Sequence, residues 1–314
     1  MKRKLITATL TAIALSLPTA IASAAPDPTT GVELNVNQDR FSAIEASFNP
    51  ALGRTEGLPA LRELRSAMWD VNPYLSLDDK PTNKRLRDVA AENNLPTREM
   101  YVASAIIDQD LTWIAIQRAS EATHRAVGLT HSRTDGTTPS TAKRGSTGLF
   151  GENLAMNSTG SLRTAVVDQW GHGELAALNA SRGVYRTSNG HLHMLINPRN
   201  GSFGFAKVST KLNGRSDTVL TAVTNPYLQA RADNSANQVR NVWLHNAAGP
   251  DRAITGLKTG TPSTNPPAPN PDPIPGQTIG SDFSNPAAIV GTIIAALTFL
   301  GGLWAIIQQF LPRR

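Results

Sequence analysis

The chain contains no cysteine, and this absence excludes several classes of protein. A disulfide-stabilised scaffold, a cysteine nucleophile and a zinc site with thiolate ligands all need that residue. A metal ion would therefore have to be held by histidine, aspartate, glutamate or backbone oxygen. Because 40% of the 314 residues are hydrophobic, the chain nevertheless has enough apolar side chains for a folded core.

Familiar hydrolase motifs are absent as well. The sequence has neither the H-E-x-x-H helix of zinc peptidases nor the G-x-S-x-G turn of serine hydrolases. It also has no internal repeat, which excludes a repeat architecture.

The positive charge of the domain is smaller than the sequence pI of about 9.8 suggests. The formal net charge is +6, and three of these charges are Lys2, Arg3 and Lys4. Residues 261–314 contain two Asp and two Arg and are neutral, which leaves +3 for residues 25–260. So small a charge does not indicate a nucleic-acid partner.

The N-terminus has the three parts of a secretory signal peptide. Basic residues 2–4 come first, an apolar run over residues 5–20 follows, and residues 22–24 read Ala-Ser-Ala, a typical cleavage site. We therefore expect residues 1–24 to be a signal peptide and the protein to be exported. The alternative is an uncleaved N-terminal anchor.

A second apolar segment lies near the C-terminus. Residues 287–307 contain no charged side chain, and as a helix they would be about 31 Å long, close to the thickness of a bilayer core. Arg313 and Arg314 follow, and positive charge marks the cytoplasmic side of a membrane helix. We predict a transmembrane anchor with a short cytoplasmic tail over residues 285–314. The alternative is a buried core helix.

A proline-rich linker precedes this anchor. Seven of the 21 prolines fall within residues 261–282, which favours an extended, semi-rigid spacer. We place the linker at residues 257–284. Export without any cysteine also suggests a bacterial surface protein, with its domain outside the cell membrane.

The rest of the chain predicts helices first and strands later. Residues 40–91 show a helical pattern interrupted by proline, so we assign residues 25–97 to a helical N-terminal extension. A long helix is expected from Thr97 to about Gly128, and a second one over residues 161–179. This order predicts an α+β fold with helices packed on an antiparallel sheet. Strands are expected over residues 191–196, 202–208, 218–224 and 239–245.

Polar residues suited to metal binding lie along this part of the chain. His131 begins a polar loop, Glu152 follows a glycine, and Glu174 lies on the second predicted helix. His191 and His193 share one face of the predicted strand, since side chains alternate there. Two histidines and two carboxylates can bind a divalent ion or act as general acids and bases. Each residue alone is also compatible with a purely structural role.

The order of these residues resembles a known family. The sequence reads His-Ser-Arg-Thr-Asp-Gly from His131, Gly-Glu-Asn-Leu-Ala from Gly151, then a Trp…Glu helix, and Gly-His-Leu-His-Met-Leu-Ile-Asn-Pro from Gly190. This set is similar to the CAP superfamily of cysteine-rich secretory, antigen 5 and pathogenesis-related 1 proteins, whose domain is also called SCP. The resemblance covers about residues 100–225, and we place the domain at residues 98–256.

The resemblance implies an α-β-α sandwich with an antiparallel sheet and a large open cleft. It also implies that two His and two Glu line this cleft, and that they bind zinc or another divalent ion, such as magnesium, in some members. The corresponding metal ligands in this chain would be His131, Glu152, Glu174 and His191.

Some positions depart from the family pattern. Glu174 lies one residue later than the usual W-x-x-E spacing allows, so its side chain could point elsewhere. His172 or His193 could then complete the site, and Asn153 is a further candidate for binding. Thr134 replaces the usual proline of the first motif.

Three functions fit these expectations. The first is a membrane-anchored surface protein whose cleft binds a divalent metal ion and a lipid, peptide or cell-wall ligand. The second is a metal-dependent, peptidase-like hydrolase in which Glu152 activates a metal-bound water. The third is a structural or adhesion protein with a vestigial cleft. We favour the binding protein and assign no catalytic residue.

Overall fold

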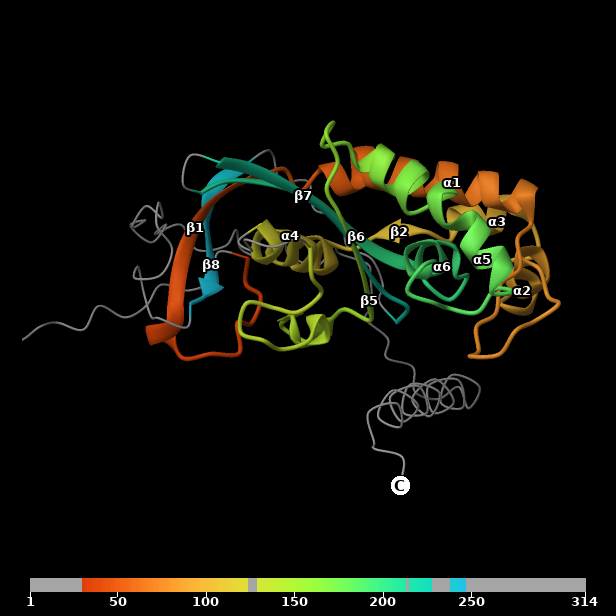
Figure 1. Ribbon diagram of the computed structural model, residues 1–314, viewed down its shortest axis with the longest axis horizontal. Helices are drawn as coiled ribbons and strands as arrows, with labels where there is room; N and C mark the ends of the chain where they lie inside the picture. The colour runs from red at the N-terminus through yellow and green to blue at the C-terminus, as the bar shows by residue number, and fades with distance from the viewer. Residues whose placement is uncertain (1–29, 124–128, 213–214, 228–237, 247–314) are drawn as a thin grey trace, which may run out of the picture. The chain divides into compact units, whose positions relative to one another are not determined.

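The computed structural model describes residues 30–123, 129–212, 215–227 and 238–246 (Figure 1). The expected signal peptide, linker and C-terminal anchor lie outside these residues. Within the described part of the chain, no helix is both long enough and apolar enough to cross a membrane. The described residues combine helices with a largely antiparallel sheet, which confirms the predicted α+β class.

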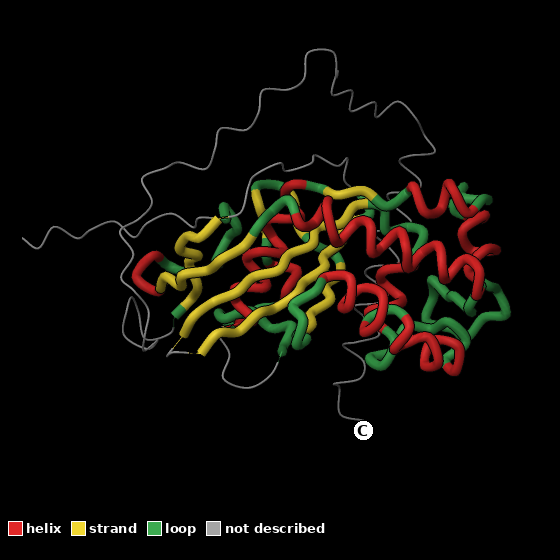
Figure 2. The backbone as a smooth tube through the Cα atoms, turned by 90° about the horizontal axis from the view of Figure 1, so that it is seen from above, coloured by secondary structure: helices red, strands yellow, loops and turns green. Residues whose placement is uncertain are grey.

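The main sheet of the described residues has the strand order β5–β7–β6–β1–β8, with β2 paired to β6. The pairs along this path are antiparallel, and β2 pairs with β6 in parallel. Figure 2 shows the strands running side by side. The strands are β1 (Phe41–Phe48), β2 (Ile106–Ile107), β5 (Gly151–Ala155), β6 (Ser202–Leu212), β7 (Arg215–Asn225) and β8 (Gln238–His245), while β3 (Lys143–Arg144) and β4 (Thr147–Gly148) form a separate hairpin.

The helix α4 (Gln109–Thr123) covers one face of this sheet (Figure 1). Its buried Ile114 belongs to the same apolar cluster as Val219 and Val223 of β7 and Ile44 of β1. Successive side chains of a strand point to opposite faces, so Leu220 and Ala222 are directed away from α4 and belong to the core on the other face. The helix and the sheet therefore form two layers with a shared core.

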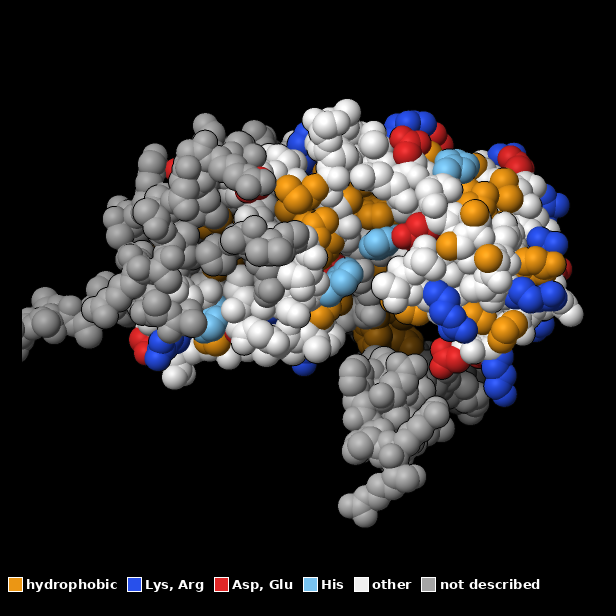
Figure 3. All heavy atoms as spheres, in the orientation of Figure 1, with side chains coloured by type: hydrophobic (Ala, Val, Ile, Leu, Met, Phe, Trp, Pro, Cys, Tyr) orange, Lys and Arg blue, Asp and Glu red, His pale blue; other side chains and the backbone are white. Residues whose placement is uncertain are grey.

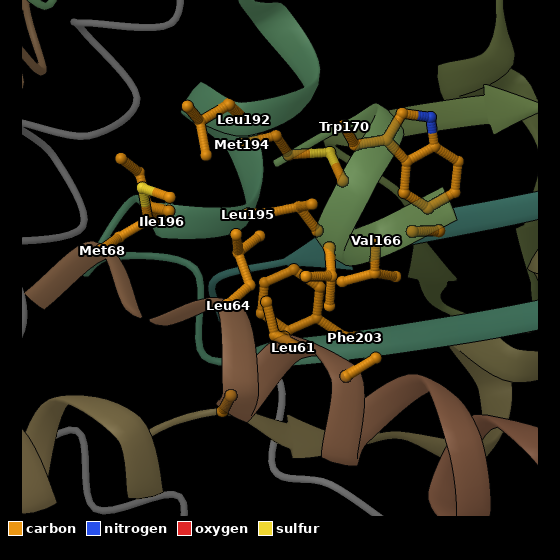
Figure 4. Packing of buried hydrophobic residues seen from close by; sticks show 14 of the residues in the cluster. Leu61, Leu64, Met68, Val166, Trp170, Leu192, Met194, Leu195, Ile196 and Phe203 are labelled. Atoms are coloured by element: carbon orange, nitrogen blue, oxygen red, sulfur yellow. The ribbon is translucent and has the colours of Figure 1, made fainter. Parts of the chain in front are cut away.

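Shorter helices pack against the opposite face of the sheet, around Phe203 of β6. Figure 4 shows Leu61 and Leu64 of α1 and Leu195 of α6 gathered near this ring. Burial of such side chains stabilises the fold by about 25 cal/mol for each Å² of apolar surface removed from water. The helices of this layer are α1 (Leu58–Val71), α2 (Leu86–Glu92), α3 (Arg98–Ala103), η4 (Thr164–Gln169), η5 (His172–Glu174), α5 (Leu175–Ala180) and α6 (Gly190–Ile196).

The prediction of helical structure throughout residues 40–91 is wrong at β1. This strand lies between β6 and β8, and the described residues 30–97 belong to the same compact unit as the rest of the sheet. Residues 25–97 are therefore not a separate helical extension, although α1 and α2 are helical as expected. Phe41 and Ala43 face one side of the sheet and Ile44 the other, so burial on both faces hides the alternation by which a strand is recognised.

The long helix predicted from Thr97 is interrupted. The helix α3 ends at Ala103, the short strand β2 follows, and α4 begins at Gln109. Asp108 starts α4, because its Oδ1 accepts a hydrogen bond from the N–H of Leu111 at 2.9 Å. The predicted end near Gly128 lies outside the described residues.

The strand predicted over residues 191–196 is the helix α6. Its backbone bonds include the N–H of His193 to the carbonyl of Asn189 at 2.9 Å. The residues Leu192, Leu195 and Ile196 are fully buried, a spacing of three and four that fits a helix. The three later predicted strands are confirmed as β6, β7 and β8.

Candidate functional site

A cleft of about 530 Å³ lies between β5, the loop at His131 and the region of α6. Figure 3 shows histidine side chains gathered near the middle of one face of the molecule, with an acidic side chain beside them. Five of the seven residues proposed from the sequence line this cleft, whereas Glu174 and His172 are outside its lining. The five are His131, Glu152, Asn153, His191 and His193.

Glu152 on β5 is the buried partner of His131. The Nδ1 atom of His131 lies 2.8 Å from Oε2 of Glu152, whose side chain is 1% exposed. Arg118 of α4 donates from Nε to Oε1 of Glu152 at 2.7 Å, and from Nη2 to the backbone oxygen of His131 at 3.0 Å. One guanidinium group therefore fixes both the carboxylate and the loop that carries the histidine.

Arg118 belongs to a chain of buried charges beneath the cleft. It pairs with Glu121 on the same helix, and Glu121 pairs with Arg133 at 2.8 Å. Burial alone lowers the pKa of Arg118, but the charges and hydrogen bonds of Glu121 and Glu152 outweigh it and raise this pKa above its usual value. Two cations and two anions thus compensate one another away from water.

Glu174 and His191 form the second histidine–carboxylate pair. The Nδ1 atom of His191 lies 2.5 Å from Oε1 of Glu174, and the N–H of Leu192 donates to Oε2 at 2.9 Å. The His191 ring stacks on the buried ring of Trp170, with centroids 6.1 Å apart. The Glu174 side chain is 14% exposed against 1% for Glu152, whereas His191 is less exposed than His131, at 30% against 54%.

A break in the chain at Gly171 brings Glu174 to His191. The single helix predicted over residues 161–179 is instead divided into η4, η5 and α5, and Gly171 has φ −87° and ψ −94°, outside the helical region. A Cβ atom on Gly171 would lie 2.5 Å from Cδ1 of Leu64, so a larger residue does not fit. The altered spacing from Trp170 to Glu174 is therefore accommodated by a turn rather than by a continuous helix.

The carboxylates of Glu152 and Glu174 are each hydrogen-bonded to an imidazole ring and so are not free in the cleft. An ionised carboxylate only accepts hydrogen bonds, so Nδ1 of each histidine is the donor, and in a neutral ring Nε2 keeps its lone pair. Metal-binding histidines in proteins are commonly oriented by carboxylates in this way. Among the described residues, no group of three or more His, Asp or Glu is placed to hold a metal ion.

The other proposed residues have different positions. Asn153 donates from Nδ2 to the backbone oxygen of His191 at 3.2 Å and so links β5 to α6. The Nε2 atom of His193 lies 2.7 Å from the carbonyl oxygen of Ser76, and burial lowers the pKa of this histidine. Because α6 is a helix, His193 does not share a face with His191. His172 is exposed on η5 and does not line the cleft.

The sequence-based prediction missed the charges that support the first pair. Arg118 and Glu121 lie three residues apart on α4, the spacing of neighbours on a helix surface, and both are buried. Arg133 is part of the motif that begins at His131 but was given no role. Charged residues on a helix that is otherwise buried were the available signal, because such charges need partners.

Arg65 of α1 is a second residue that the sequence did not reveal. Its buried guanidinium donates from Nε to the carbonyl of Leu195 at 3.0 Å and from Nη2 to that of Asn200 at 2.7 Å. Desolvation lowers its pKa, with a smaller opposing contribution from Tyr101. These bonds hold the end of α6 and the turn that follows it, which form one wall of the cleft.

Comparison with known proteins adds no assignment. The chain matches no protein-family model and no curated protein.

Proposed function

We propose that the protein is an exported, membrane-anchored binding protein of a bacterial cell surface, built on a CAP-type sandwich. Its cleft would bind a divalent metal ion together with a cell-wall, lipid or peptide ligand. The observation that carries the proposal is the occurrence of His131 and His191 in one cleft, each with Nδ1 on its own carboxylate. Two histidines that are each oriented by a carboxylate favour metal binding over a purely structural role, because a structural role would need only one histidine–carboxylate pair.

The metal ion would be held by Nε2 of His131 and Nε2 of His191, while Glu152 and Glu174 orient the rings. This assignment changes the expected role of the glutamates from ligands to hydrogen-bond acceptors. Imidazole nitrogen suits zinc, whereas magnesium prefers oxygen ligands. Zinc is therefore the favoured ion of the two.

A hydrolase is less well supported. The oxygen atoms of Glu152 are engaged by the Arg118 guanidinium and the His131 ring, which leaves this carboxylate poorly suited to accept a proton from water. We therefore retain binding, rather than hydrolysis, as the function of the cleft.

Zinc titration by calorimetry tests this proposal on the full chain in detergent micelles. One equivalent of Zn²⁺ should bind, Mg²⁺ should not compete, and affinity should fall as the pH is lowered, because a ligating imidazole must be neutral. The His131→Ala/His191→Ala double variant should lose binding by at least about a hundredfold.

His172→Ala is the matched control, since this histidine is exposed and outside the cleft. It should bind zinc as the unaltered protein does. Zinc binding that survives the double variant would show that the ion lies elsewhere and would overturn the assignment.

A further inference from the structure

The most exposed aromatic rings in the described part of the chain are concentrated at the cleft. Phe150, Tyr185 and Tyr227 are 52%, 57% and 57% exposed, and no other described Phe, Tyr or Trp is a large exposed hydrophobic residue. Phe150 and Tyr185 line the cleft, and Tyr227 packs edge-on against Phe150 with centroids 5.3 Å apart. Large rings left in water around a cavity are typical of a binding surface.

The surface between these rings is polar. Asn197, Asn200 and the exposed Thr187 line the cleft together with its histidines, and their side chains carry amide and hydroxyl groups that can form hydrogen bonds. The lining thus combines flat apolar faces with many small donors and acceptors. A ligand that matches it must present apolar faces and hydroxyl or amide groups along the same chain.

The charge of the cleft favours an acidic ligand. The carboxylate of Glu152 is compensated by Arg118 and His131, as described above. Arg199 also lines the cleft and is exposed, and among the described residues its side chain makes a hydrogen bond to Asn93 at 3.4 Å but no ion pair. The cleft therefore presents the positive charge of Arg199, whereas the negative charge of Glu152 is already compensated.

Two other classes of ligand fit less well. An acyl chain needs a continuous apolar channel, and the polar side chains between the rings interrupt one. An extended peptide would add to the free edge of β5, but there the carbonyl of Leu154 already accepts from Nε1 of Trp170 at 3.3 Å. The side chain of Asn153 also spans from β5 to α6.

We propose that the cleft binds an acidic glycan chain, with sugar rings stacked on Phe150 and Tyr185 and a carboxylate paired with Arg199. The C–H groups on one face of a sugar ring carry partial positive charge and meet the negative face of an aromatic ring. The hydroxyl and amide groups at the sugar edges then contact the polar side chains that lie between the aromatic rings. This inference rests on the proposed function of the cleft as a ligand site, but it requires no metal ion.

Calorimetry with two matched hexasaccharides tests the inference on the full chain, in micelles of a detergent without a sugar headgroup. The acidic probe alternates glucuronic acid with N-acetylglucosamine, and the neutral probe contains N-acetylglucosamine alone. The acidic probe should bind more tightly. Phe150→Ala and Tyr185→Ala should each weaken its binding by about tenfold.

Arg199→Gln should abolish the preference for the acidic probe, with little effect on the neutral one. The control is Met100→Ala on α3, which removes an exposed apolar side chain outside the cleft and should change neither affinity. Circular dichroism and the urea midpoint of each variant should match those of the unaltered protein, so that any loss is assigned to binding.

The outcomes separate this inference from the proposed metal site. Zinc binding without binding of either hexasaccharide overturns the glycan inference and leaves the metal site intact. Glycan binding that survives the His131→Ala/His191→Ala variant supports the inference even if no zinc binds. Binding that is unchanged in the Phe150 and Tyr185 variants, or stronger binding of palmitate or of a decapeptide than of the acidic probe, contradicts it.

Discussion

The two histidine–carboxylate pairs are held in place by different parts of the structure. We call His131 with Glu152 the strand-side pair and His191 with Glu174 the helix-side pair. The strand-side carboxylate is buried on β5 and bound to the charged network of α4. The helix-side carboxylate lies on short helical turns and is held by one backbone N–H besides its histidine, with the Trp170 ring beneath that histidine.

This difference separates two ways of orienting an imidazole. On the strand side, the position of the carboxylate is tied to the stability of the whole fold, because uncompensated buried charge is strongly destabilising. On the helix side, orientation depends on local backbone geometry around Gly171. Loss of the strand-side support should therefore destabilise the whole fold, whereas loss of the helix-side support should disturb only the local backbone.

The largest effect is expected from Arg118→Met, which removes the shared cation of the strand side. Glu121 would keep Arg133, but Glu152 would be buried without its guanidinium partner. The free energy of unfolding should fall by about 3–5 kcal/mol, measured by urea denaturation.

The matched control is Arg98→Met, which breaks an exposed pair with Asp70. It should cost less than about 1 kcal/mol, because exposed ion pairs are screened by solvent. Equal losses in the two variants would show that the network on α4 does not provide the special support described here.

A smaller effect is expected from Gly171→Ala on the helix side. The added Cβ would clash with Leu64 and with backbone, so the turn must shift, at a cost of about 1–3 kcal/mol. Zinc affinity should fall as well, since Glu174 would move away from His191. Gly148→Ala is the control: its Cβ would meet Cγ of Lys143 at 3.7 Å, an ordinary contact, and neither stability nor affinity should change appreciably.

The smallest expected effect is a pH dependence of stability that arises from His193 on α6, the helix that also carries His191. The folded-state pKa of His193 is lowered by burial from its ordinary value of 6.5, so below about pH 6.5 the unfolded chain binds a proton that the folded chain does not. Its contribution is therefore fully present above this pH and is lost as the pH falls. His193→Gln keeps an N–H donor for Ser76 but does not titrate.

Urea denaturation at about pH 7.5 and about pH 5 measures this contribution. The unaltered protein should lose more stability between the two values than His193→Gln loses. An identical loss in both would exclude a role for His193 in the pH response.

The strand-side pair was also the more predictable of the two pairs from the sequence. His131 and Glu152 lie in compact polar motifs, and the structure places them in direct contact. The strands β6 and β7 were also expected from their strand-like runs, and the α+β class from the order of elements. Compact motifs and short strand-like runs carry this information locally.

The helix side depended on information that local pattern does not contain. The segment Gly190–Ile196 has apolar residues at both strand and helix spacing, and only packing against α1 and Trp170 decides between them. A side chain at the Gly171 break is excluded in part by Leu64, a residue more than one hundred positions earlier. Arg65 was missed for the same reason, because Leu195 and Asn200, which accept its hydrogen bonds, lie far away in sequence.

The central claim is that two imidazoles, each held at Nδ1 by a carboxylate, present Nε2 to a shared metal ion. ¹⁵N NMR of the histidine rings of the full chain, before and after addition of Zn²⁺, tests it most directly. Before zinc, and at a pH at which both rings are neutral, His131 and His191 should be protonated on Nδ1 and not on Nε2, and zinc should shift both Nε2 resonances while leaving those of His172 unchanged. Protonation of either ring on Nε2, or Nε2 resonances that do not respond to zinc, would contradict the claim.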